Sequence, residues 1–171
     1  EMCIRDRDKM QESERQWAWG QVGLQAAKRH MDDAVDWYAK TGKAPLSDEA
    51  YQWKVRSALR SQEWGKVRDT ILSMPAALAS QPEWIYWLGR ALKAGGLTTE
   101  ADAQFVKIAG QANFYGNLAD EELGRNIQPP QKAAPPTAEE LKTATNQPGI
   151  RRSLAFYRVD LRTEAVREWN W

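Results

Sequence analysis

Apolar residues recur along most of this chain at every third or fourth position, which is the spacing of one face of a helix. The pattern is interrupted near Arg29–His30, so the first part of the chain is predicted to form two short antiparallel helices. The positions expected to be buried are Trp17, Gly20, Leu24 and Ala27 before the break, and Met31, Ala34, Val35 and Tyr38 after it.

Two more pairs of helices are predicted downstream. One helix is expected to begin at Ser47, which can cap it, with Asp48 and Glu49 favourably placed in the first turn. Its partner ends before Pro75, and the members of the third pair are separated by Gly95–Gly96. The expected buried positions are Tyr51, Val55, Ala58, Leu59, Trp64, Val67, Ile71, Leu72, Trp84, Trp87, Leu88, Ala91, Leu92, Ala101, Phe105, Ile108 and Ala109.

The helical pairs repeat. Superposing Ala58–Leu59 on Ala91–Leu92 gives an offset of 33 residues, and Arg56 falls on Arg90 after a slip of one residue. This period is the size of one helical hairpin in a solenoid. Because no stretch shows sustained alternation with period two, the predicted fold is all-α, a superhelical stack of antiparallel helical hairpins of the tetratricopeptide-like, α-solenoid type.

A proline-rich segment interrupts the helical pattern between residues 126 and 136. It contains Pro129, Pro130, Pro135 and Pro136, which favour extended backbone over helix. Helix is predicted to resume after Thr137, because Thr137 and Glu140 have the spacing of a capping box. The chain is therefore divided into a helical domain over 9–125, a linker over 126–136 and a second domain beginning at 137.

Both ends of the chain suggest a piece of a longer protein. Residues 1–8 include Met2–Arg7, a string of the kind that sequencing adapters leave in translated reads, and are excluded from the fold. A helix at Glu168–Trp171 is expected to run on past the last residue.

The composition of the chain argues against a nucleic-acid partner, a membrane span and a zinc site. The 24 Lys and Arg residues against 23 Asp and Glu give a net charge of +1, which argues against a nucleic-acid-binding face. No apolar run is long enough for a membrane span. His30 is the only histidine and Cys3 the only cysteine, so no zinc site is expected and no cofactor is implied.

One segment carries a resemblance to a known family. Residues 114–124, FYGNLADEELG, resemble the FYG-x-LA-x-E-x-LG signature of soluble lytic murein transglycosylases, and they precede a proline-containing linker as in that family. Other similar segments, in order, are 17–20, 34–38, 56–64, 84–92 and 161–169. The resemblance identifies residues 9–125 with the C-terminal part of the family's superhelical U-type domain and 137–171 with the start of its L-type linker domain.

The resemblance implies a periplasmic enzyme that cleaves the β-1,4 bond between N-acetylmuramic acid and N-acetylglucosamine in peptidoglycan, leaving a 1,6-anhydro sugar. A single glutamic acid acts in turn as general acid and general base in that family. It belongs to a Glu-Ser pair followed by a Gly-Leu-Met-Gln run. The only Glu-Ser here, Glu12–Ser13, lacks that run. The resemblance therefore implies that the catalytic domain lies beyond residue 171 and that this chain is the non-catalytic scaffold.

Three residues are candidates for contact with peptidoglycan glycan strands. Trp84 and Trp87 share a stripe with Leu88, so they are expected in the core, whereas Tyr86 lies off that stripe and is expected to be exposed. Arg151 and Arg152 could contact an anionic glycan or simply cover a helix face. The alternative to a transglycosylase scaffold is a stand-alone helical-repeat protein that binds peptides or proteins in its concave groove.

Overall fold

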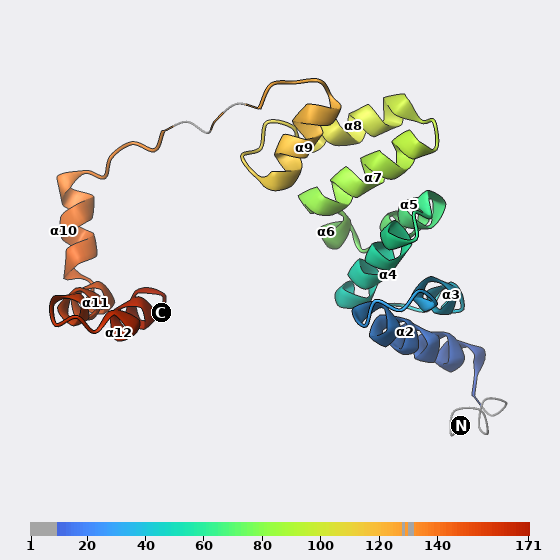
Figure 1. The fold of residues 1–171 in the computed structure, drawn as a ribbon, viewed down its shortest axis with the longest axis horizontal. Helices are drawn as coiled ribbons and strands as arrows, with labels where there is room; N and C mark the ends of the chain where they lie inside the picture. Colours follow the sequence, from blue (N-terminus) through green and yellow to red (C-terminus); the bar gives the residue numbers. More distant parts are fainter. Residues whose placement is uncertain (1–9, 128, 130–131) are drawn as a thin grey trace. The chain divides into compact units, whose positions relative to one another are not determined.

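The structure is a computed structural model that describes residues 10–127, 129 and 132–171 (Figure 1). Over these residues it contains eleven α-helices and no strand, which confirms the all-α prediction. The chain divides into two compact units, Glu1–Pro129 and Pro130–Trp171, and the division falls inside the predicted proline-rich linker. The prediction that residues 1–8 are foreign lies outside the described residues.

The first unit is a stack of helical hairpins. Its helices are α2 (Glu12–Lys28), α3 (Ala34–Ala39), α4 (Asp48–Arg60), α5 (Trp64–Leu72), α6 (Ala76–Ala79), α7 (Pro82–Ala94), α8 (Thr98–Ile108) and α9 (Phe114–Glu122). Helix α2 packs on α3 and α4, α4 on α5, α5 on α7, and α7 on both α8 and α9 (Figure 1). The stack of hairpins predicted from the 33-residue offset is present in this unit.

The ends of these helices follow local signals. The Ser47 hydroxyl accepts a hydrogen bond from the backbone N–H of Ala50 at 3.2 Å and caps α4, as predicted. Pro82 occupies the first turn of α7, where its missing N–H leaves no intrahelical bond unmade. The turn after α7 requires a left-handed residue, and Gly96 supplies it with φ of +80°.

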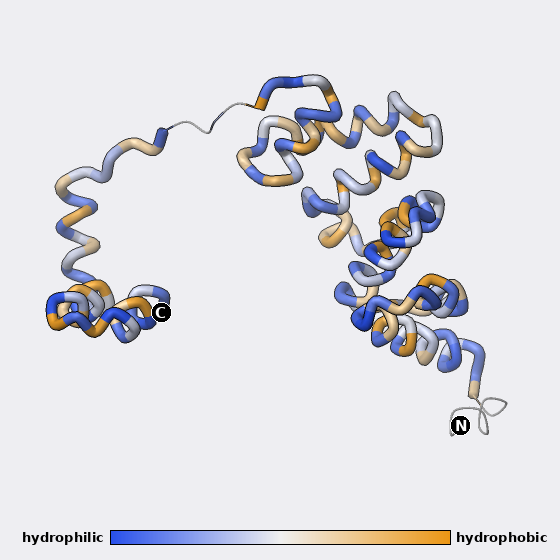
Figure 2. The backbone as a smooth tube through the Cα atoms, viewed as in Figure 1, coloured by the Kyte–Doolittle hydropathy of each residue, from blue (hydrophilic) through white to orange (hydrophobic). Residues whose placement is uncertain are grey.

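Three apolar clusters hold the hairpins together, and the apolar stripes that form them alternate with polar positions along each helix (Figure 2). The cluster members are Leu24, Ala26, Ala27, Ala34, Tyr38 and Ala50; Val55, Ala58, Val67, Ile71, Met74, Leu78, Trp84 and Ala91; and Tyr86, Ala101, Phe105, Ile108 and Ala119.

The close approach of neighbouring helices depends on glycine at two contacts. Gly23 of α2 lies against the ring of Tyr38 on α3, and Gly89 of α7 lies against the ring of Phe105 on α8. A Cβ atom on Gly89 would lie only 2.5 Å from Cε1 of Phe105.

Three predicted core positions are wrong. Trp17 is 54% exposed because it lies in the first half of α2, whose buried residues begin at Gly20. Leu72 is 66% exposed because it is the last residue of α5, where the chain turns away. Met31 is exposed because it lies in the turn between α2 and α3 rather than on a helix.

The second unit contains α10 (Ala138–Asn146), α11 (Pro148–Arg158) and α12 (Arg162–Trp169). Helices α11 and α12 pack against each other as a hairpin. The hydroxyl of Ser153 donates to the carbonyl oxygen of Ala165 at 2.8 Å, and these two are the buried residues in this unit's described part. The expectation of a helix continuing through Trp171 is wrong, because α12 ends at Trp169.

The predicted capping box at the start of α10 is present. The hydroxyl of Thr137 accepts the backbone N–H of Glu140 at 3.2 Å, and the Glu140 carboxylate accepts the backbone N–H of Thr137 at 2.7 Å. This backbone hydrogen bond, with the one from the Thr137 hydroxyl, holds the pKa of Glu140 below its ordinary value. The carboxylate form therefore stabilises the beginning of α10.

We expect the first turn of α10 to loosen in acid because the folded-state pKa of Glu140 is lowered. The stabilisation of α10 by the Glu140 carboxylate is complete above the unfolded-state pKa of this group. It is lost as the pH falls through the folded-state pKa, roughly from pH 5 downwards. Backbone NMR shifts of residues 138–146, recorded during an acid titration, should follow this loss. Glu140→Gln should abolish most of the pH dependence, whereas Glu139→Gln should retain it; equal titration curves for both variants would contradict the assignment.

Candidate functional site

The three candidate contact residues lie in different units. Tyr86 belongs to α7 in the first unit, whereas Arg151 and Arg152 belong to α11 in the second.

The expectation that Tyr86 is exposed is wrong. Its side chain is 3% exposed, and its ring centroid lies 5.8 Å from that of Phe105 and 5.7 Å from that of Tyr115. Its hydroxyl accepts a hydrogen bond from Nη1 of Arg90 at 3.0 Å. Helix α7 is covered by α5 on one side and by α8 and α9 on another, so a second stripe of α7 is buried. Tyr86 is a core residue with no free ring face for a sugar.

The FYG segment forms α9, and its small and polar residues fix the turn that joins α8 to α9. Asn113 caps α9 by accepting the backbone N–H of Gly116 at 2.9 Å. The carboxylate of Asp120 is 6% exposed and accepts the backbone N–H of Gly110 at 2.9 Å. A buried polar group without a partner is costly, so this bond ties the end of α8 to α9. Asp120 was missed in the sequence because its partner is a backbone group.

A charged cluster joins the same segment to α7. The carboxylate of Glu122 lies 3.1 Å from Nη1 of Arg90 and 2.8 Å from Nζ of Lys93. The Tyr86 hydroxyl, with a smaller contribution from Glu122, raises the pKa of Arg90, and the hydrogen bond to Glu122 raises that of Lys93. These groups hold fixed charges and connect helices. The FYG segment, which forms α9, thus connects this helix to α7 and to the end of α8.

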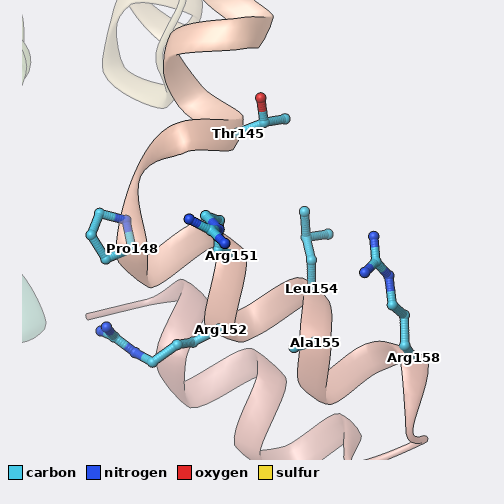
Figure 3. Close-up of a pocket in the computed structure, with 7 residues that line it drawn as sticks. All are labelled: Thr145, Pro148, Arg151, Arg152, Leu154, Ala155 and Arg158. Carbon is cyan, nitrogen blue, oxygen red and sulfur yellow. The ribbon is translucent and has the colours of Figure 1, made fainter.

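The second unit has a hollow along α11 that includes both Arg151 and Arg152 in its lining. It has a volume of about 610 Å³, and Figure 3 shows the side chains of Arg151, Leu154 and Arg158 projecting on the same side of the helix. Their spacing of three, four and seven residues places them on one helical face. The full lining is Thr145, Pro148, Arg151, Arg152, Leu154, Ala155 and Arg158.

Arg151 and Arg152 have different surroundings. Arg152 turns toward α12, where its guanidinium pairs with Glu168, with Nε at 2.8 Å from the carboxylate oxygen (Figure 3). Within the described part of the chain, no carboxylate lies at ion-pair distance from Arg151 or Arg158. The hollow therefore presents Arg151 and Arg158 beside apolar side chains, an arrangement that can bind an anion, and its lining contains no carboxyl group for acid-base chemistry.

Glu12 does not have the properties of a general acid. It is fully exposed, and hydrogen bonds from Arg15 and then from Gln16 lower its pKa. A glycosidase acid requires a raised pKa so that it is protonated near neutral pH. Among residues 10–127, 129 and 132–171, no group of three or more His, Cys, Asp or Glu residues could hold a metal ion.

The chain is similar to known proteins at the level of solved structures. No protein-family model matches the chain, and no curated protein matches it in sequence. A solved structure to which it is similar comes from Pseudomonas aeruginosa. It is the lytic transglycosylase Slt, crystallised as an inactive mutant. The similarity has a TM-score of 0.73 and 26% sequence identity, and covers 94% of this chain and 26% of that chain.

The similarity to Slt supports the link to lytic transglycosylases that the FYG segment suggested. The chain spans about a quarter of the length of that enzyme. None of the helices described is both long and apolar enough to cross a membrane.

Proposed function

We propose that this chain is the non-catalytic helical scaffold of a periplasmic lytic murein transglycosylase. The observation that carries the proposal is the similarity to Slt over 94% of this chain. The parent enzyme cleaves the β-1,4 bond between N-acetylmuramic acid and N-acetylglucosamine and leaves a 1,6-anhydro product. Its catalytic glutamate belongs to a separate domain outside residues 1–171.

The scaffold helps to position glycan strands for that catalytic domain, and the hollow on α11 is where it contacts them. Peptidoglycan carries carboxylates on its peptides, so it is an anionic partner for Arg151 and Arg158. Leu154 lies between these two cations and can cover an apolar part of the strand (Figure 3). Arg152 has a different role, because its guanidinium is engaged by Glu168.

The proposed cleavage reaction is tested on the parent protein. We expect its gene to encode, after Trp171, a Glu-Ser pair followed by a Gly-Leu-Met-Gln run within a domain of ordinary size, roughly two hundred residues. The full-length protein should release anhydro-muropeptides from purified sacculi, and mass spectrometry identifies them because they are one water lighter than hydrolysis products. Absence of the catalytic pattern, or release of reducing ends only, would contradict the proposal.

The contact surface is tested with the 171-residue chain. Exposed charges contribute up to about 1 kcal/mol each, so Arg151→Gln with Arg158→Gln should weaken co-sedimentation with sacculi about three- to tenfold at low salt. Added salt should reduce binding of the parent chain toward that of the variant.

The matched control is Arg162→Gln with Arg167→Gln. These two residues lie on α12 in the same unit and outside the hollow, so the variant removes the same charge. An equal loss of sacculus binding in the two variants would show that net charge alone accounts for the binding. It would contradict the proposal that the hollow is a specific contact site.

A further inference from the structure

Arg56 on α4 lies over the rings of two tryptophans. Its guanidinium carbon lies 5.3 Å from the ring centroid of Trp53 on the same helix and 5.6 Å from that of Trp84 on α7. A guanidinium stacked on aromatic faces is attracted by their electron density and loses part of its freedom of movement. Arg56 is therefore oriented before any ligand arrives, although its side chain is exposed.

Arg56 differs in its ion pairing from the arginine of the next hairpin. The arginine at the related position of the next hairpin, Arg90, lies over Tyr86 in a similar way and also pairs with Glu122 at 3.1 Å. In the described chain, no carboxylate lies at ion-pair distance from Arg56. Its recorded hydrogen bond, from Nη1 to the side-chain oxygen of Gln52, is 3.5 Å long and therefore weak. The donors of the guanidinium fork remain available.

Arg56 lines a pocket between the α2–α3 turn and α4. The pocket has a volume of about 310 Å³, and Ala27, Met31 and Trp53 supply apolar walls. Arg60 and Asp32 line it too; they pair with each other at 3.1 Å, so their charges offset, and the Asp32 side chain is largely exposed. An exposed pair of this kind is weak, and among the described residues Arg56 is the pocket arginine that has no carboxylate at ion-pair distance.

We propose that this pocket binds the terminal carboxylate of a short peptide whose last residue has a small apolar side chain. Arg56 receives the carboxylate through two parallel N–H donors, the geometry that a guanidinium matches best. The apolar walls receive the side chain. A sugar is less suited, because the Trp53 ring already lies under Arg56 and 5.9 Å from the ring of His30. This site does not depend on the function proposed above.

The probe is N-acetyl-alanyl-alanine, titrated into the isotopically labelled 171-residue chain and followed by NMR. We expect the indole N–H of Trp53 and the amide of Met31 to shift, and the corresponding peptide amide to bind at least about tenfold more weakly, because it lacks the charge. Arg56→Lys keeps the charge but removes the fork, and should also weaken binding about tenfold. Arg68→Lys, on α5 and outside the pocket, should bind as the parent chain does.

Three outcomes would overturn the proposal. The first is the absence of shifts at Trp53 and Met31 in the parent chain, a result that does not depend on any variant folding. The second is equal binding of the acid and the amide, or equal affinity of the Arg56→Lys and Arg68→Lys variants. The third is tighter binding of N-acetylmuramic acid than of the peptide at these residues, which would make this a sugar-acid site.

Discussion

Replacing Trp84 by alanine is expected to lower the free energy of unfolding of the first unit by about 3–5 kcal/mol. The indole is 2% exposed and packs in the cluster that joins α4, α5, α6 and α7. Truncation removes the largest buried side chain of that cluster and leaves a cavity that neighbours such as Val67 and Ile71 can fill only in part. Unfolding in urea, followed by far-ultraviolet circular dichroism, measures the loss.

Two further variants separate cavity formation from other effects of losing a tryptophan. Trp17→Ala removes an indole that is 54% exposed and should change the free energy of unfolding by no more than about 0.5 kcal/mol. Trp84→Phe should cost less than Trp84→Ala, since Nε1 of Trp84 is buried with no hydrogen-bond partner among the described residues. Comparable losses for Trp17→Ala and Trp84→Ala would contradict the assignment of Trp84 to the core.

Replacing Gly116 by alanine is expected to destabilise the same unit by about 3 kcal/mol. A Cβ atom at this position would lie 2.2 Å from the backbone oxygen of Gln111, which cannot rotate away as a side chain could. The turn before α9 would have to shift, which also strains the hydrogen bond from Gly116 to Asn113. The glycine of the FYG segment is thus required by packing, and its replacement is measured by the same urea unfolding.

Gly65→Ala is the matched control for Gly116→Ala. Gly65 lies in α5, and nothing stands within 4 Å of the position its Cβ would take. Alanine there reduces the backbone freedom of the unfolded chain, so a gain of about 0.5–1 kcal/mol is expected. The two substitutions therefore have opposite signs. Similar effects of both would contradict the close contact at Gly116.

Much of the fold could be predicted because its signals are local. Ser47 and Thr137 cap their helices through hydrogen bonds to residues three positions away, so the sequence alone identifies them. The 33-residue offset between the second and third hairpins identifies the repeat. The FYG segment pointed to lytic transglycosylases, and the similarity to Slt supports that link although no family model matches.

The sites were less predictable because they depend on what lies opposite each helix. Tyr86 lies off the main apolar stripe, and only the packing of α8 and α9 against α7 shows that a second stripe is buried. Arg151 and Arg152 are neighbours in sequence, yet Glu168 on another helix engages only Arg152. Arg158, seven residues from Arg151, faces the same hollow and was not identified from the sequence.

The sequence by itself thus determined the helical hairpins of the first unit, the capped beginnings of α4 and α10 and the repeat of the hairpins, because these follow from bonds and periodicities within a few residues. The tertiary structure alone decided which charges are neutralised and which aromatic rings are covered. Arg56 and Arg90 illustrate the difference: they hold related positions in successive hairpins, but within the part of the chain that the structure describes only Arg90 meets a carboxylate, from Glu122 on α9. The physical reason is that ion pairing and burial depend on the facing element, which no local pattern specifies.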